Sequence, residues 1–187
     1  MIAAPIVQLV ADILWFGNGV LLTGTVFRQI GYVLFIPAVF GVLYHAPSKV
    51  GVVAMWLCLL GIGGGIAIVA LYRVGAGAEV GQSGLPLFVE QAFSQSPGLG
   101  ISIFIPGILF PLGHVLFSLA FWREQSQHRL LSALFLTIGI LFFMGNALEM
   151  KTPLFFSDVL MIIAYVWMAK RNVSSHKSDV SQLFNMS

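Results

Sequence analysis

Apolar residues form six long runs along the chain, and each run has close to the about 20 residues that a helix needs to cross a bilayer. The runs cover residues 4–23, 26–45, 50–72, 100–122, 130–149 and 154–170. Their apolar positions are continuous and do not alternate with polar ones, which favours helices over strands. In lipid, only helices and closed barrels satisfy their own backbone hydrogen bonds. The pattern predicts an all-α, polytopic membrane helix bundle in one domain, residues 1–170, followed by a polar cytoplasmic tail, 171–187, that frays.

One long connection, residues 74–99, separates the third run from the fourth and is rich in Gly, Ser and Pro. Leu85, Phe88, Val89 and Phe93 would share one face of a helix, so a short interfacial helix is one interpretation. A packed loop is the other.

The positions of Lys and Arg predict how the chain is oriented, because short cytoplasmic loops carry an excess of positive charge. With six spans and a cytoplasmic N-terminus, six basic residues lie on the inner side: Lys49, Arg123, Arg129, Lys170, Arg171 and Lys177. Three lie on the outer side: Arg28, Arg73 and Lys151. We therefore expect a multi-pass protein of the cytoplasmic (inner) membrane of a bacterium, with both termini in the cytoplasm.

Composition agrees with a membrane protein. Of 187 residues, 58% are hydrophobic and 9% are charged, against roughly 25% charged residues in a soluble domain. The formal charge of +2 is too small to indicate a nucleic-acid partner. The single cysteine, Cys58, excludes an intrachain disulfide and a metal cage built from several cysteines.

Two segments are weakly similar to each other. Residues 35–44 can be aligned with residues 110–119, and each is followed by a polar loop and another apolar run. The two halves would cross the membrane in the same direction, as in a parallel internal repeat.

Three stretches in the second half of the chain have motifs that are typical of membrane-helix edges. Residues 113–123 end in Phe-Trp-Arg, residues 134–145 are apolar and end in Gly, and residues 165–171 end in Trp-Met-Ala-Lys-Arg. In these about 80 residues the chain resembles a loose group of uncharacterised bacterial six-helix integral membrane proteins. The resemblance implies a fold and no activity.

Ionisable residues inside the spans are the first candidates for a site, because each costs a few kcal/mol in the bilayer unless it is paired or faces water. Counting about 1.5 Å per residue from the inner ends places Asp12 and His114 at a similar depth, roughly 12 Å. The two side chains could form a pair that holds a proton or contacts a ligand. The alternative is structural: Asp12 caps a packing contact, and His114 bonds to backbone loosened by Pro111.

A second polar layer is expected nearer the outside. Asn146 and Glu149 are three residues apart on one helical face, and the sixth span could bring Asp158 to them. Asn18 lies at the same level, and Lys151 is a possible counter-charge. The alternative is that Glu149 and Lys151 simply lie in water at the interface.

The sequence predicts no cofactor. A b-type haem would need two facing histidines, and His45 lies at the inner end of its span while His114 is deeper by about 12 Å. Common enzyme motifs are absent as well.

Small and bending residues are expected at helix contacts. Gly61 and Gly65 are four apart and permit close helix approach. Pro37, Pro106 and Pro111 should bend the second and fourth spans.

Three functions remain open at this point. The first is a non-enzymatic accessory or structural subunit that packs against partner helices, forms a homo-oligomer or binds membrane lipid or another apolar ligand. The second is a small proton-coupled transporter or channel that uses Asp12 and His114. The third is an intramembrane enzyme acting on a lipid.

Overall fold

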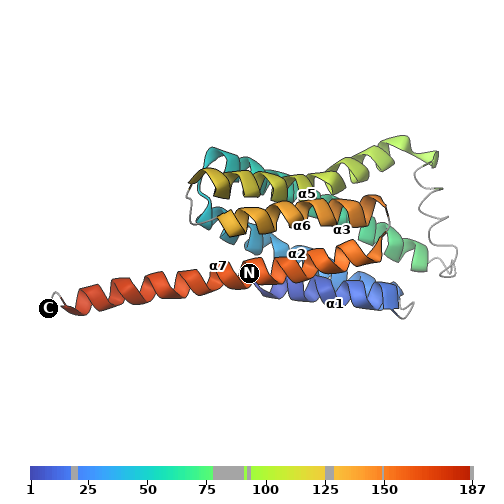
Figure 1. Ribbon diagram of the computed structural model, residues 1–187. Coiled ribbons are helices and arrows are strands. Elements are labelled where there is room, and N and C mark those ends of the chain that lie inside the picture. The colour runs from blue at the N-terminus through green and yellow to red at the C-terminus, as the bar shows by residue number, and fades with distance from the viewer. Residues whose placement is uncertain (18–20, 78–90, 92–93, 125–128, 149, 186–187) are drawn as a thin grey trace.

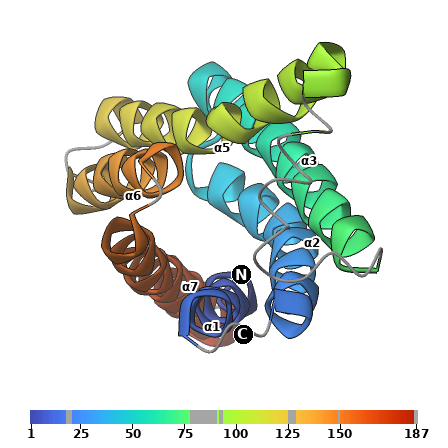
Figure 2. The same cartoon turned by 90° about the vertical axis from the view of Figure 1, so that its right-hand side faces the viewer.

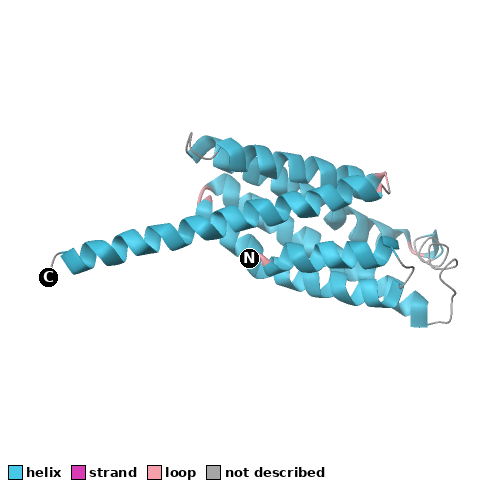
Figure 3. Ribbon diagram, turned by 60° about the horizontal axis from the view of Figure 1, so that its bottom comes forward, coloured by secondary structure: helices cyan, strands magenta, loops and turns pink. Residues whose placement is uncertain are grey.

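The computed structural model describes the chain except for residues 18–20, 78–90, 92–93, 125–128, 149 and 186–187. Six long helices form the bundle: α1 (Ala3–Gly17), α2 (Leu21–His45), α3 (Lys49–Gly77), α5 (Pro97–Glu124), α6 (Arg129–Ala147) and α7 (Lys151–Asn185). The described residues contain no strand, as Figure 3 shows. The predicted all-α fold is therefore confirmed.

The helices close into a ring in the order of the sequence. Each of them packs against the next, α3 packs against α5, and the last helix, α7, packs against the first, α1 (Figure 2). This order places α1 between α2 and α7, and α5 between α3 and α6. As a result, α1 and α5 lie on opposite sides of the ring.

Glycines allow the closest helix contacts. A Cβ atom on Gly61 of α3 would overlap the backbone of Phe110 in α5, and one on Gly113 of α5 would overlap Cys58 in α3. A Cβ on Gly65 would come within 2.6 Å of the Tyr32 ring in α2. Gly61 and Gly65 thus lie where helices approach closely, the position in which small residues bring membrane helices together.

The prolines lie inside their helices without ending them. Pro37 is within α2, and Pro106 and Pro111 are both within α5. Each removes one backbone donor from its helix, and neighbouring helices make such interruptions tolerable in a membrane bundle.

The outside of the ring is apolar. Exposed side chains include Ile13, Val33, Phe40, Trp56 and Phe156, whereas most of the charged and hydroxyl side chains of the helix middles are buried. The buried polar residues are Gln8, Asp12, Thr25, His114, Ser118, Ser132, Ser157 and Asp158. A surface of this kind is suited to lipid, since polar groups in membrane helices face the bundle interior.

Five of the helices are long and apolar enough to cross a membrane, where the sequence predicts six spans. The exception is α1: its 15 residues cover about 22 Å, less than the roughly 30 Å of hydrocarbon. The predicted first span, 4–23, was too long because Leu21 already begins α2. Five long apolar helices nevertheless indicate a multi-pass membrane protein.

The last helix does not end with its apolar segment. Its membrane-compatible part is Lys151–Lys170, and the same helix continues to Asn185, projecting from the bundle (Figure 1). The stretch that was expected to fray is therefore helical.

The two ends of the bundle differ in which termini they contain. We call one of them the far end. There α1, α3 and α6 end, at Gly17, Gly77 and Ala147. The helices α2, α5 and α7 begin at this same end, at Leu21, Pro97 and Lys151. The N-terminus and the projecting part of α7 lie toward the other end (Figure 1). The segment for which an interfacial helix was considered, 85–93, falls almost entirely outside the described residues.

Candidate functional site

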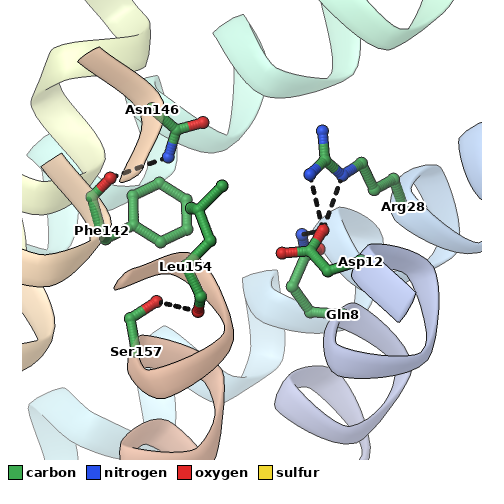
Figure 4. A network of polar contacts seen from close by, with 7 residues as sticks. All are labelled: Gln8, Asp12, Arg28, Phe142, Asn146, Leu154 and Ser157. Carbon is green, nitrogen blue, oxygen red and sulfur yellow. Dashed lines mark hydrogen bonds and ion pairs between the residues drawn. The ribbon is translucent and has the colours of Figure 1, made fainter. Parts of the chain in front are cut away.

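A buried ion pair joins the first two helices. Arg28 of α2 donates from Nε and Nη2 to Oδ1 of Asp12 in α1, at 2.9 and 2.6 Å (Figure 4). The Asp12 side chain is 2% exposed and the Arg28 side chain 13%. Gln8, one turn before Asp12, donates from Nε2 to the same oxygen at 3.3 Å. The carboxylate charge is thus neutralised inside the bundle.

Local geometry explains this pairing. The connection between α1 and α2 spans only residues 18–20, so the two helices run side by side in opposite directions. Asp12 lies five residues before the end of α1, and Arg28 lies seven residues after the start of α2. Both therefore sit about 7 to 11 Å from the far end of the bundle.

Asp158 of α7 joins the same group. Its side chain is fully buried, with 0% exposed, and it interacts electrostatically with Asp12 and Arg28. It also lies seven residues after the start of its helix, at the same depth. Tyr32, one turn after Arg28 in α2, interacts with all three charged groups. We refer to Gln8, Asp12, Arg28, Tyr32 and Asp158 as the far-end polar cluster.

Several oxygens of this cluster lack a hydrogen-bond donor. Oε1 of Gln8, Oδ2 of Asp12 and both carboxyl oxygens of Asp158 are buried, and no donor among the described residues reaches them. Buried polar atoms in native proteins nearly always have a partner. Four such acceptors in one cluster therefore indicate that a donor or a cation belongs there.

His114 occupies a different place. Its Nδ1 lies 2.9 Å from the carbonyl oxygen of Phe110, and its ring stacks on that of Phe135 at 5.7 Å. Because a carbonyl only accepts, Nδ1 carries the proton. Its Nε2 is buried, with no partner among the described residues. The structure does not bring Asp12 and His114 together, because α1 and α5 lie across the ring from each other.

Cys58 and His114 do not form a catalytic pair. The Cys58 Sγ lies 3.8 Å from His114 Nδ1 and 3.7 Å from the Phe110 carbonyl oxygen. Since Nδ1 already donates to that carbonyl, it cannot accept the thiol proton. The histidine is thus held as the structural alternative describes, by a bond to the backbone just before Pro111.

The second polar layer is divided. Asn146 donates from Nδ2 to the Phe142 carbonyl oxygen of its own helix at 2.9 Å (Figure 4). Asp158 joins Asp12 and Arg28, and Lys151 is exposed at the start of α7. Asn18 and Glu149 lie outside the described residues.

A pocket of about 270 Å³ opens among α2, α3, α5 and α6 in the far-end half of the bundle. Its walls are mostly aromatic rings and glycines, and its polar residues are Tyr32 and Asn146: the lining consists of Tyr32, Gly61, Gly64, Gly65, Ile68, Gly107, Ile108, Phe110, Pro111, Phe142, Phe143 and Asn146. Tyr32 belongs both to this lining and to the far-end polar cluster. The pocket and the charged groups are therefore neighbours.

The positions of the His, Cys, Asp and Glu side chains can be compared with the needs of a metal ion or a haem. Within the part of the chain that the structure describes, no three His, Cys, Asp or Glu side chains are grouped to hold a metal ion. His45 lies in the last turn of α2, beside Tyr44, while His114 lies in the middle of α5.

Sequence reasoning missed three members of the cluster: Gln8, Arg28 and Tyr32. Arg28 was assigned to an outer loop, although it lies inside α2. A usable signal was present. Asp12 and Arg28 are opposite charges at similar distances on either side of a short break, which is how an antiparallel helix pair brings two residues together.

Comparisons with protein-family models, with curated protein sequences and with solved structures found no match. The resemblance to bacterial six-helix membrane proteins therefore stays a prediction. What the fold itself defines is an all-helical, multi-pass membrane protein with a charged cluster buried between its first, second and last helices.

Proposed function

We propose that this protein is a non-enzymatic membrane protein that binds a small, largely apolar molecule in the pocket among α2, α3, α5 and α6. The observation that carries the proposal is the pocket itself, about 270 Å³ in volume. This is slightly below the roughly 300 Å³ at which ligand pockets usually begin, so its ligand is small or enters only in part.

The lining supports an apolar ligand with few polar groups. Phe110, Phe142 and Phe143 offer ring surfaces, whereas Tyr32 and Asn146 can orient a polar group. Gly107 is an exposed residue of the lining, and a Cβ atom there would have nothing within 4 Å.

The other two candidate functions have less support. Proton-coupled transport through Asp12 and His114 requires contact between side chains that have separate partners. A lipid-acting enzyme requires a nucleophile beside a base, and the Cys58–His114 contact does not supply one. Membrane lipids remain the partner that we propose, because the exposed outer surface of the helices is apolar.

The test compares two glycine variants. Gly107→Leu adds a bulky side chain at the lining of the pocket, whereas Gly63→Leu adds the same side chain to α3 outside that lining. Both glycines are exposed, and a Cβ atom on either would have nothing within 4 Å. Both variants gain helix propensity, so neither is expected to unfold the protein. Each protein is purified from membranes as the full chain and analysed by native mass spectrometry.

We expect wild type and Gly63→Leu to carry the same non-covalently bound molecule, and Gly107→Leu to lose it. The proposal is wrong if Gly107→Leu carries that molecule at the wild-type level, or if none of the three proteins carries one.

A further inference from the structure

The far-end polar cluster has more hydrogen-bond acceptors than donors. The Nε and Nη2 atoms of Arg28 and Nε2 of Gln8 all donate to a single oxygen, Oδ1 of Asp12. The second oxygen of Asp12 and both oxygens of Asp158 receive no bond from a described residue. These three oxygens belong to two carboxyl groups that interact with each other.

The charges are unequal as well. Two carboxylates face one guanidinium, so the cluster would carry a net charge of −1 if both were ionised. The helices packed against α7 offer no further compensation. The charged side chain of α1 is Asp12, and Arg28 and the neutral Tyr32 of α2 face the cluster. The described charged residue of α6 is Arg129, which lies at the opposite end of the bundle.

A net charge buried among apolar helices is costly, and such groups are neutralised by a proton or by an ion. A proton on Asp158 supplies the missing hydrogen-bond donor and also removes the net charge. The protonated carboxyl becomes a donor, Oδ2 of Asp12 becomes its acceptor, and the cluster becomes neutral. Carboxyl pairs that share one proton behave in this way because two close like charges cannot both persist.

We propose that Asp158 and Asp12 form an intramembrane proton-binding site, with the proton carried by Asp158 and shared with Oδ2 of Asp12. Arg28 fixes the charge on Asp12, so that Asp12 stays the acceptor. The unpartnered, buried Oε1 of Gln8 lies beside the same carboxylate and adds acceptor character to the site. This site does not depend on a ligand in the neighbouring pocket.

Infrared spectroscopy of the full chain in lipid vesicles tests the proposal, because a protonated carboxyl has a C=O stretch that an ionised one lacks. We expect a protonated-carboxyl band at neutral pH in the wild type that is lost in Asp158→Asn. Asp179→Asn is the matched control: it makes the same change on the same helix, beyond the apolar segment Lys151–Lys170. It should leave the band intact. A wild-type band that persists in Asp158→Asn overturns the proposal, and so does the lack of any such band.

Thermal unfolding provides a second, independent measurement. An asparagine at position 158 is neutral and donates from its amide, so it imitates the protonated acid. We expect Asp158→Asn to melt at or above the wild-type temperature, and Asp158→Leu, which cannot donate, to melt lower. If Asp158→Asn melts lower and the wild type is stabilised by Na⁺ but not by an equal concentration of choline, the occupant is a metal cation and the proton site is refuted.

Discussion

Arg28 holds Asp12 by two nitrogens on one carboxylate oxygen, at 2.6 and 2.9 Å, and the pair connects helices that follow each other in the sequence. Arg28 is the cation that Asp12 meets in the far-end polar cluster, whereas Arg28 also interacts with a second acid, Asp158. The energetic consequences of this arrangement can be measured directly.

Removing the cation of the pair should be strongly destabilising. We expect Arg28→Gln to lower the free energy of unfolding by about 3 to 5 kcal/mol, because the charge of Asp12 stays buried without its cation. Asp12→Asn should cost less, because Arg28 keeps a second acid, Asp158, beside it. The double variant should lose less than the sum of the two. Reversible unfolding in detergent measures all three.

Arg73→Gln is the control for that experiment, since Arg73 donates to Gln29 at an exposed position. It should change stability by no more than about 0.5 kcal/mol. Equal effects of Arg28→Gln and Arg73→Gln would contradict the buried pair.

Two serines bind α5 to α6, away from the charged cluster. Ser132 Oγ donates to the Ser118 carbonyl oxygen at 2.9 Å, and the two hydroxyls lie 3.0 Å apart. We expect Ser132→Ala to lower stability by about 0.6 kcal/mol, the average for a hydrogen bond between membrane helices. Thr137→Val, which removes an exposed bond within α6 itself, should have no measurable effect. A larger loss of stability in Thr137→Val than in Ser132→Ala would argue against this interhelical bond.

The close helix contact at Gly61 predicts that alanine substitutions at Gly61 and at the nearby Gly63 differ sharply in their effect on stability. Gly61→Ala forces a methyl group onto the Phe110 backbone and should cost about 1 to 3 kcal/mol. Gly63→Ala meets nothing within 4 Å and should leave stability equal or higher. Parallel thermal melts compare the two. Similar melting of both variants would show that α3 and α5 are farther apart than the structure has them.

The direction of the chain through the membrane is testable with accessibility probes. We propose that α1, although short, crosses with its neighbours, so the N-terminus and the projecting end of α7 lie on the same face. With Cys58 replaced by Ala, tags at both termini should react with an impermeant probe from one face, and a cysteine at the exposed Ser94 from the other. A tag at the N-terminus reacting from the Ser94 face would mean that α1 does not cross.

Much of the fold follows from the length of the apolar runs. Segments of about 20 continuous apolar residues can only be buried helices or membrane spans, so the all-helical class and most helix positions were predictable. The boundary between α1 and α2 was harder to predict, because Leu21 and Leu22 are as apolar as the residues before the break between the helices. Hydropathy does not mark where one helix ends and another begins when both flanks suit lipid.

Predicting the site from depth alone was insufficient. The number of residues between Asp12 or His114 and the end of its span could be counted from the sequence, but the order of helices around the ring could not, and this order places α1 and α5 apart. Arg28 illustrates a second cause. A positive charge near a span boundary looks like a loop residue until the antiparallel neighbour supplies a carboxylate at the same height.

Closure of the ring by α7 against α1 has a consequence for biogenesis. The first hairpin can leave the translocation machinery as an electrically neutral unit, since its acid and its base are already matched. The second acid arrives only with the final helix. Until synthesis is nearly complete, the inner face of α1 has no α7 to cover it, so a chain truncated before Lys151 would expose polar groups to lipid and be a recognisable target for membrane quality control.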